Sequence, residues 1–166
     1  MKTLYIIRHA KSDWKDLSLS DFERPLNKRG EKNAFFMGEL FSQQKIHPDL
    51  IVASPAVRAK ITAKEIAKKV GYNTKEIVYA ERLYLADVDT IEEVLKKAPS
   101  SKNTIFLVGH NPGLTLFAEY ISGYDIDNIP TCGIFCVTLK NDDWKSIGKG
   151  MAKFVSFDYP KKHKES

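Results

Sequence analysis

The stretch "LYIIRHAKSDW" (residues 4–14) joins a run of apolar residues directly to a group of polar ones. Four apolar or aromatic residues in succession are typical of a strand that is buried in a parallel sheet. Arg8, His9 and Lys11 follow that run closely. In open α/β sheets, ligands bind beyond the carboxyl ends of the strands. These cationic or titratable side chains therefore predict a ligand site at the end of a core strand.

The rest of the chain alternates short β-rich runs with longer helical patterns. Strands are expected at about residues 3–8, 50–53, 76–80, 104–109, 133–139 and 151–156. Helices are expected over residues 28–44, 55–70 and 113–122, with a shorter one after Asp89. This alternation predicts an α/β fold in which helices cover both faces of a mostly parallel sheet. The turn-like "NDDW" between the last two strands predicts an antiparallel edge.

The helix expected over residues 55–70 has the clearest boundaries. Ser54 is a suitable N-cap, Pro55 suits the first helical position, and Gly71 can end the helix. Its apolar residues recur at helical spacing on one side, which predicts that this side packs on the sheet.

Length and composition indicate a compact globular protein. A chain of 166 residues, 43% apolar and 28% charged, is long enough for one buried core. We expect one domain over residues 1–160 and a basic, disordered tail, "KKHKES", over residues 161–166. No signal peptide is recognisable and no apolar run approaches the ~20 residues that cross a bilayer, so no membrane partner is expected.

The net charge of +5 permits binding to nucleic acid, acidic proteins or phosphorylated molecules. Nucleic acid is not expected, because no aromatic residues interleave with the stripe formed by Lys60, Lys64 and Lys68. Cys132 and Cys136, if they share a strand, lie about 13 Å apart, which is too far for a disulfide. A reducing cytoplasm is therefore the expected location. The sequence does not indicate an oligomeric state.

Two histidines and two arginines are predicted to meet at the same edge of the sheet. Arg8 and His9 follow the first strand, Arg58 lies in "SPAVRA" after the second, and His110 lies in "GHNPG" after the fourth. A metal is not expected there, because two guanidinium groups repel a cation. An anion fits better, since a guanidinium group can donate two parallel hydrogen bonds to phosphate oxygens and stays charged at neutral pH.

A phosphate among these residues predicts covalent chemistry at His9. Arg8 and Arg58 would balance the charge of the phosphate, and His110 would add a donor if protonated. His9 could then attack phosphorus in line, provided that its attacking nitrogen is unprotonated and its other nitrogen donates to a fixed acceptor. The intermediate would be a phosphohistidine.

Three motifs carry a family resemblance. In chain order, "RHAKS", "SPAVRA" and "GHNPG" resemble motifs of the histidine phosphatase superfamily, whose fold is phosphoglycerate mutase-like. The stretch "DFERPLNKRG" (residues 21–30) is similar to the segment that accompanies "RHAKS" in short bacterial phosphohistidine phosphatases of the SixA type. The resemblance implies a three-layer α/β/α fold, no metal and no organic cofactor. It also implies that His9 accepts the phosphoryl group in a pocket formed by Arg8, Arg58 and His110.

Glu81 and Asn111 stand at two positions where branches of that superfamily differ. In the branch resembling phosphoglycerate mutases, a glutamate after the third strand donates a proton, and Glu81 in "AERLYLAD" occupies the matching place. Glu81 could instead orient a water molecule or hold Arg8 or Arg58. In the acid phosphatase branch an aspartate follows the second histidine, whereas Asn111 stands here, which speaks against phytase-like chemistry.

The remaining polar residues of the first loop have less certain partners. Lys11 and Ser12 are near enough to His9 to touch phosphate. Arg24 is expected to pair with Asp21 or to line the entrance, and Trp14 and Phe22 to shape the loop.

The sequence thus predicts an enzyme that removes phosphate from phosphohistidine on a protein. The short chain leaves little to build a lid, so an open pocket could admit a side chain of another protein. The alternatives are a small-molecule phosphomonoesterase or mutase that acts on a phosphorylated metabolite, and a non-catalytic module that binds phosphorylated partners.

Overall fold

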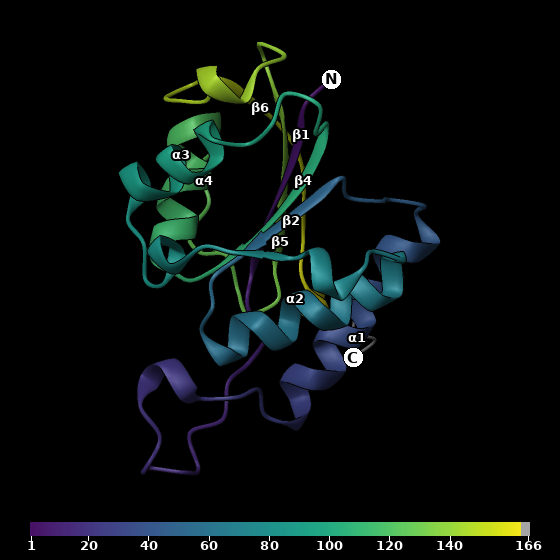
Figure 1. Ribbon diagram of the computed structural model, residues 1–166, viewed down its shortest axis with the longest axis vertical. Helices are drawn as coiled ribbons and strands as arrows, with labels where there is room; N and C mark the ends of the chain where they lie inside the picture. Colours follow the sequence, from purple (N-terminus) through teal and green to yellow (C-terminus); the bar gives the residue numbers. More distant parts are fainter. Residues whose placement is uncertain (164–166) are drawn as a thin grey trace.

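The computed structural model describes residues 1–163 and has three layers, with one sheet between two pairs of helices (Figure 1). The strands are β1 (Thr3–Arg8), β2 (Leu50–Ala53), β3 (Val78–Tyr79), β4 (Thr104–Gly109), β5 (Ile134–Leu139) and β6 (Ala152–Asp158). The helices are α1 (Lys28–Gln43), α2 (Val57–Val70), α3 (Val88–Lys96) and α4 (Gly113–Ser122). Short 3-10 helices are η1 (Asp21–Glu23), η2 (Thr74–Glu76), η3 (Glu81–Leu83), η4 (Trp144–Ser146) and η5 (Pro160–His163). The predicted α/β/α architecture is confirmed.

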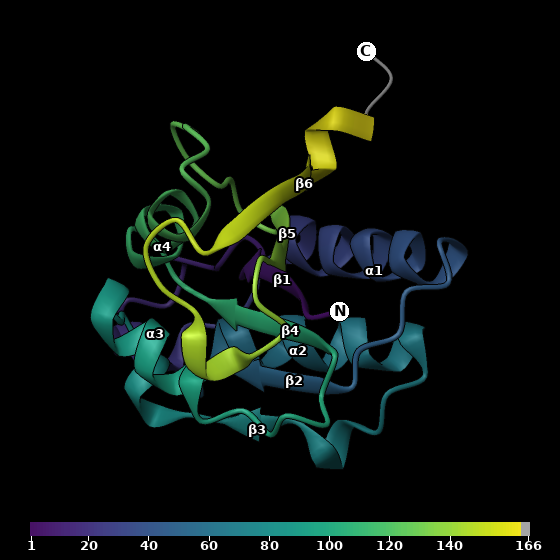
Figure 2. The ribbon, with the colours of Figure 1, turned by 90° about the horizontal axis from the view of Figure 1, so that it is seen from above.

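The strand that carries the opening motif lies inside the sheet. The strand order is β3-β2-β4-β1-β5-β6, and Figure 2 shows β1 between β4 and β5. β1 pairs in parallel with β4 and antiparallel with β5, and β6 pairs antiparallel with β5. The antiparallel edge is therefore confirmed, and it begins one strand earlier than "NDDW" indicated. Because β1 has a partner on both sides, its carboxyl end is held rigidly.

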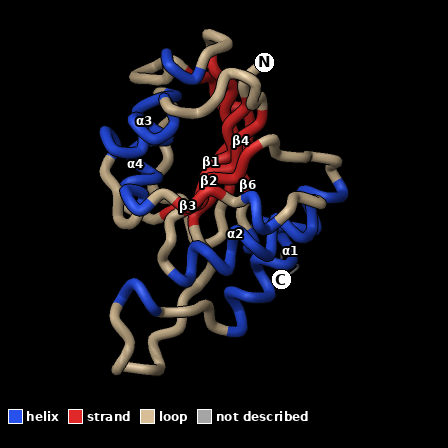
Figure 3. Tube along the Cα trace, viewed as in Figure 1, coloured by secondary structure: helices blue, strands red, loops and turns tan. Residues whose placement is uncertain are grey.

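Alternate side chains of β1 enter two different hydrophobic clusters. Leu4 and Ile6 belong to the cluster that includes residues of α3 and α4, whereas Ile7 belongs to the cluster that includes residues of α1 and α2. Figure 3 shows the sheet between these two pairs of helices. Burial of each apolar side chain contributes roughly 1.5–3 kcal/mol. The apolar half of the opening stretch thus anchors the chain in both layers of the core.

The loop after β1 extends away from the sheet and leads into α1 in the neighbouring helical layer (Figure 3). The Asn27 backbone N–H donates to the Lys11 carbonyl oxygen (3.0 Å), and the Asn27 side chain caps α1 by accepting from the Gly30 N–H (2.8 Å). A methyl group at Gly30 would overlap the Lys11 carbonyl oxygen. The first turn of α1 can therefore pack directly on the backbone beside His9 only because residue 30 is a glycine.

The last described residues form η5 and contact the domain. His163 bonds the Asp158 carboxylate (2.6 Å) and packs edge-on against Phe36. The expected disordered tail over residues 161–166 stays a prediction, and residues 164–166 lie outside the described residues. Across residues 1–163, no helix is long and apolar enough to cross a membrane.

Replacing Gly30 with alanine tests the close approach of α1. We expect Gly30→Ala to lower the free energy of unfolding by about 1–3 kcal/mol, because the added methyl group must displace backbone. Gly148→Ala is the control: its methyl group would meet only the flexible Glu92 side chain at 3.4 Å, and a change within about 0.5 kcal/mol is expected. Urea unfolding measures both variants. Equal stabilities of Gly30→Ala and the wild type would contradict the packing described here.

Candidate active site

His9 is held by backbone contacts from three separate segments. Its N–H donates to the Gly109 carbonyl (3.1 Å), and its carbonyl accepts from the Cys132 N–H (3.0 Å). The next N–H, that of Ala10, donates to the Thr62 hydroxyl on α2 (3.0 Å). The His9 side chain is buried, with 7% of the residue exposed. The imidazole is thus fixed relative to β4, to the loop before β5 and to α2.

Hydrogen bonds assign the His9 tautomer. Nδ1 lies 2.7 Å from the Ala10 carbonyl oxygen, which can only accept, so Nδ1 carries the proton. Nε2 lies 3.4 Å from Arg58 Nε, a donor, so Nε2 presents its lone pair. Burial lowers the pKa of His9 to about 4, although the bond to Ala10 acts in the opposite direction, and Arg58 and Arg8 lower it further. The imidazole is therefore neutral at pH 7 and nucleophilic at Nε2.

Arg58 brings a buried positive charge to His9. It lies in the first turn of α2 and is 3% exposed. Its Nη1 donates to the Asp21 backbone carbonyl (2.6 Å) and its Nη2 to Asp21 Oδ2 (2.9 Å). Because each Nη carries two hydrogens, the guanidinium group keeps donor capacity beyond these bonds.

Asp21 joins the arginines from the first loop, and the sequence interpretation had placed it only beside Arg24. The Arg24 pairing is confirmed, with Nη2 2.9 Å from Asp21 Oδ1. Tyr84 donates its hydroxyl to Asp21 Oδ2 (2.5 Å). Burial acts to raise the pKa of Asp21, but hydrogen bonds from Tyr84, Arg24 and Arg58 outweigh it and hold that pKa well below its usual range. Asp21 is therefore ionised at neutral pH and binds two guanidinium groups at once.

His110 faces His9, and its ring is oriented by Ser54. The two imidazole centroids lie 5.1 Å apart, and His110 Nε2 lies 2.7 Å from Ser54 Oγ. Ser54 Oγ also accepts from the Ala56 N–H (3.2 Å), and its remaining hydrogen and lone pair allow it either to donate to His110 Nε2 or to accept from it. When Ser54 donates, Nδ1 carries the His110 proton; this buried nitrogen has no hydrogen-bond partner within residues 1–163. Burial, assisted by His9 and Arg58, lowers the pKa of His110 to about 3.

The N-cap assignment of Ser54 is therefore wrong. The helix begins at Val57, after Ala56 at the N-cap position, and Pro55 precedes it. The local signal for a helix start was real, but the Ser54 hydroxyl bonds a histidine that is 56 residues away in the chain. The donor predicted from a protonated His110 is also available from the neutral ring in the tautomer that carries its proton on Nδ1.

Arg8 supplies a second guanidinium group, which has no carboxylate partner among the described residues. Its Nη1 donates to the Ile129 carbonyl oxygen (3.0 Å), and its buried Nε has no partner among the described residues. No ion pair of Arg8 occurs in residues 1–163. Burial lowers the pKa of this guanidinium group from its ordinary value. Arg8 is thus a candidate to bind an added anion.

Asn111 holds the loop that positions Arg8. Its side-chain N–H group donates to the Ile129 carbonyl (2.9 Å), and its Oδ1 accepts from the Thr115 N–H and hydroxyl. An amide can donate and accept at the same time, whereas an ionised aspartate only accepts. Asn111, which stands where the acid phosphatase branch has an aspartate, therefore has a structural role: it holds the loop whose carbonyl binds Arg8.

Ser12 and Lys11 are not among the hydrogen-bond partners of His9 or Arg58 within residues 1–163. Ser12 is buried and accepts from Arg24 Nη1 (2.6 Å). The same guanidinium group lies 3.4 Å above the centre of the Trp14 ring. Lys11 is exposed and lines a neighbouring cavity. Ser12 and Trp14 thus hold Arg24 in place, and phosphate contacts of Lys11 and Ser12 stay predictions.

Tyr84, rather than Glu81, approaches the site from the segment after β3. The Tyr84 ring centroid lies 5.5 Å from that of His110. Glu81 is exposed in η3 and lines a separate apolar cavity beside Val52 and Val94. No hydrogen bond or ion pair links Glu81 to Arg8 or Arg58 within the described part of the chain. Its predicted role as a proton donor stays a prediction.

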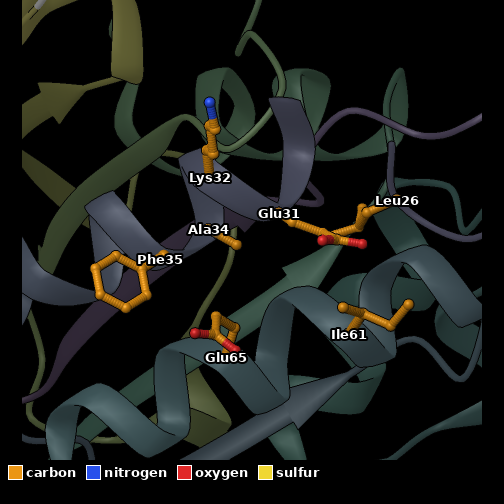
Figure 4. Close-up of a pocket in the computed structure, with 7 residues that line it drawn as sticks. All are labelled: Leu26, Glu31, Lys32, Ala34, Phe35, Ile61 and Glu65. Atoms are coloured by element: carbon orange, nitrogen blue, oxygen red, sulfur yellow. The ribbon is translucent and has the colours of Figure 1, made fainter. Parts of the chain in front are cut away.

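A cavity of about 580 Å³ lies away from these groups, between α1 and α2 (Figure 4). Glu31 of α1 and Glu65 of α2 border it together with the apolar Phe35 and Ile61, and Lys32 points away from it in Figure 4. Two carboxylates disfavour an anionic ligand there.

Titration of the two imidazoles tests the electrostatics of the site. In the ligand-free protein we expect His9 to titrate near pH 4 and His110 near pH 3, both below the ordinary value of 6.5. Since the unfolded chain takes up these protons near pH 6.5, stability is expected to fall as the pH drops from about 6.5 towards 4. Heteronuclear NMR of the ring nitrogens follows both groups and their tautomers. A His9 midpoint near 6.5, or a proton on Nε2 at pH 7, would contradict this site geometry.

Comparisons with known proteins agree with this arrangement. Residues 4–84, which include Arg8, His9 and Arg58, match the model of the histidine phosphatase superfamily (branch 1). An uncharacterised chloroplastic protein of Arabidopsis thaliana is 31% identical over 152 residues, which are 87% of this chain and 69% of that protein.

Solved structures show the same fold over nearly the whole chain. A crystal structure from Agrobacterium tumefaciens, provisionally assigned as the phosphohistidine phosphatase SixA, is 26% identical with a TM-score of 0.81, and the match covers 96% of this chain and 98% of that one. A structure of the protein histidine phosphatase SixA complexed with tungstate has a TM-score of 0.83 at 21% identity, covering 98% and 99% of the two chains. The sequence match and the fold together show that the chain belongs to the histidine phosphatase superfamily and is SixA-like.

Proposed function

We propose that the protein removes phosphate from phosphohistidine on another protein, through a covalent phosphohistidine at His9. Membership of the superfamily supports a phosphatase, and the substrate is the proposed part. The observation that carries the proposal is the neutral His9 ring, which presents Nε2 beside Arg58 while Nδ1 donates to the Ala10 carbonyl.

The proposed reaction has two displacements at phosphorus. In the first, the lone pair of His9 Nε2 forms a bond to phosphorus, and the bond from phosphorus to the substrate imidazole breaks with its electron pair on that imidazole. The leaving ring departs as a neutral imidazole when its other nitrogen carries a proton. An imidazole, with a reference pKa of about 6.5, takes up that proton near neutral pH. In the second, water attacks the phosphohistidine, releasing inorganic phosphate and a proton and restoring neutral His9. A strong general acid is not required in either step.

The surrounding donors suit the charge that develops on the transferring group. Arg58 and Arg8 would bind phosphate oxygens through their remaining N–H groups, and His110 would donate through Nδ1. An imidazole buried beside guanidinium groups is a weak base, so it is not quenched by protonation at pH 7. The same cations would stabilise the transition state for transfer to His9.

Two points favour a phosphohistidine substrate over the alternatives. An imidazole leaving group requires no strong general acid, and the fold is similar to that of SixA. The complex of SixA with tungstate shows that a protein of this fold binds an oxyanion. A small-molecule phosphomonoesterase or mutase would use the same His9 and needs separate testing. We also propose a reducing cytoplasm as the location, since Cys132 and Cys136 are both free and buried.

Trapping of the intermediate tests the covalent mechanism. After rapid mixing with a phosphohistidine protein and quenching in base, we expect a phosphoryl group on a peptide that contains His9. His9→Gln is expected to lose the adduct and turnover, while His47→Gln, at a histidine remote from the site, retains both. Normal turnover by His9→Gln would contradict the mechanism. Higher kcat/KM for sugar phosphates or phosphoserine peptides than for phosphohistidine protein would favour the small-molecule alternative, and no turnover of any phosphorylated compound would favour a binding module.

Arg58→Ala tests the proposed phosphate pocket. Loss of one preorganised donor is expected to lower kcat by roughly 100- to 1,000-fold and to weaken vanadate binding. Arg58→Lys restores the charge without the planar fork, so only partial recovery is expected. Stopped-flow kinetics and vanadate inhibition provide the two readouts. Unchanged vanadate affinity in Arg58→Ala, in a variant with wild-type unfolding behaviour, would refute this placement of Arg58.

A further inference from the structure

A small cavity of about 230 Å³ lies close to the phosphate site, between α1, the loop before β5 and the chain after β6. Its lining combines cationic and hydrogen-bonding side chains: Lys11, Arg29, Asn33, Thr131, Tyr159 and Lys161. Apart from the predicted phosphate contact of Lys11, none of these residues has a role in the proposed reaction.

The charged residues that line this cavity within residues 1–163 are all positive. Lys11, Arg29 and Lys161 come from three separate parts of the chain, and no carboxylate of the described residues lines the cavity. No ion pair of these three residues occurs within residues 1–163. Arg29 also lies in the first turn of α1, where the helix dipole adds partial positive charge. An oxyanion bound here would relieve the mutual repulsion of the cations.

Backbone contacts link the cavity to the reacting residues. Lys11 lies two residues after His9, which limits the separation of their Cα atoms to about 7 Å. Thr131 stands between Ile129, whose carbonyl binds Arg8, and Cys132, whose N–H binds the His9 carbonyl. The segments that hold Arg8 and His9 therefore also carry residues that line the cavity, which places the cavity next to the backbone of the proposed phosphate pocket.

We propose that the cavity formed by Lys11, Arg29, Thr131 and Lys161 is a docking subsite for a side-chain carboxylate near the phosphohistidine of a protein substrate. This inference rests on the proposed function and adds a specificity determinant to it. An aspartate or glutamate of the substrate would contact the exposed ammonium and guanidinium groups, while the phosphoryl group occupies the pocket at His9. A second phosphate on a small molecule offers the same oxyanion chemistry, so the test separates the two sources.

Paired phosphohistidine peptides test the subsite in the full-length protein. Each pair differs only in carrying glutamate or glutamine at one flanking position, and the set moves that position along both sides of the phosphohistidine. We expect one register in which the glutamate peptide has roughly three- to tenfold higher kcat/KM, mainly through a lower KM. The preference should weaken at high salt, because exposed charges are screened.

Variants of the lining connect that preference to the cavity. Arg29→Ala and Lys161→Ala are each expected to bring the glutamate-to-glutamine ratio close to one, and Arg29→Glu to invert it. Lys32→Ala removes the same charge from the same helix at a residue outside this cavity, so its ratio should match the wild type. A general folding defect would lower the turnover of both peptides alike, so an inverted ratio in Arg29→Glu beside a ratio near one in Arg29→Ala excludes that cause.

The outcomes distinguish this inference from the proposed function. Equal turnover of glutamate and glutamine peptides in every register would overturn the subsite and leave the phosphatase proposal intact. The same would follow if Lys32→Ala lost the preference as strongly as Arg29→Ala. If a bisphosphorylated sugar competes in an Arg29-dependent manner while the peptides are equal, the cavity binds a second phosphate and the carboxylate assignment is wrong. Absence of turnover for every phosphohistidine peptide would overturn the proposed function itself.

Discussion

The hydrogen bond from His9 Nδ1–H to the Ala10 carbonyl oxygen, 2.7 Å long, determines what the rest of the site can do. It places the only ring proton on the side away from the pocket, so that Nε2 faces Arg58 with its lone pair. The bond can form only because the backbone of residues 9 and 10 is held by Gly109, Cys132 and Thr62. The defined tautomer of His9, on which its proposed role as nucleophile depends, is thus a consequence of the position of β1 inside the sheet.

Burial separates the charges of the site into two kinds. The imidazoles of His9 and His110 give up their protons when desolvated, whereas the guanidinium groups keep theirs because their ordinary pKa is far above neutrality. Asp21 stabilises Arg58 and Arg24 together, whereas the Arg8 side chain donates to one backbone carbonyl, that of Ile129, among the described residues. The pocket therefore carries net positive charge beside a neutral imidazole, the combination that the proposed transfer of a phosphate dianion to His9 requires.

Much of the fold was predictable because it depends on local patterns. The apolar runs at residues 3–8, 50–53 and 104–109 coincide with β1, β2 and β4, and the helix at 113–122 coincides with α4. Once strands and helices were placed, the rule that ligands bind beyond strand carboxyl ends brought Arg8, His9, Arg58 and His110 to one edge. These four residues meet because their strands end at the same edge of the sheet. The order of strands and helices that causes this can be predicted from the periodicity of apolar residues.

The missed features depend on contacts between distant segments. Ser54 has the composition of an N-cap, yet its hydroxyl bonds His110, and no local signal distinguishes those two uses. Tyr84 lies only three residues beyond Glu81, but the turn of η3 brings the tyrosine to Asp21 and leaves the glutamate exposed. Pairing of Asp21 with Arg24 is one of the two roles that the sequence predicts for Arg24, whereas the bond of Asp21 to Arg58 spans 37 residues and depends on the tertiary fold.

The central claim is that His9 Nε2 is the phosphoryl acceptor, and a crystal structure with vanadate tests it most directly. The account predicts a trigonal-bipyramidal vanadate with Nε2 of His9 at one apex, Nδ1 still bonded to the Ala10 carbonyl, and Arg8, Arg58 and His110 around the equatorial oxygens. Vanadate bound through Nδ1, or bound at another residue with His9 Nε2 still in contact with Arg58, would contradict it.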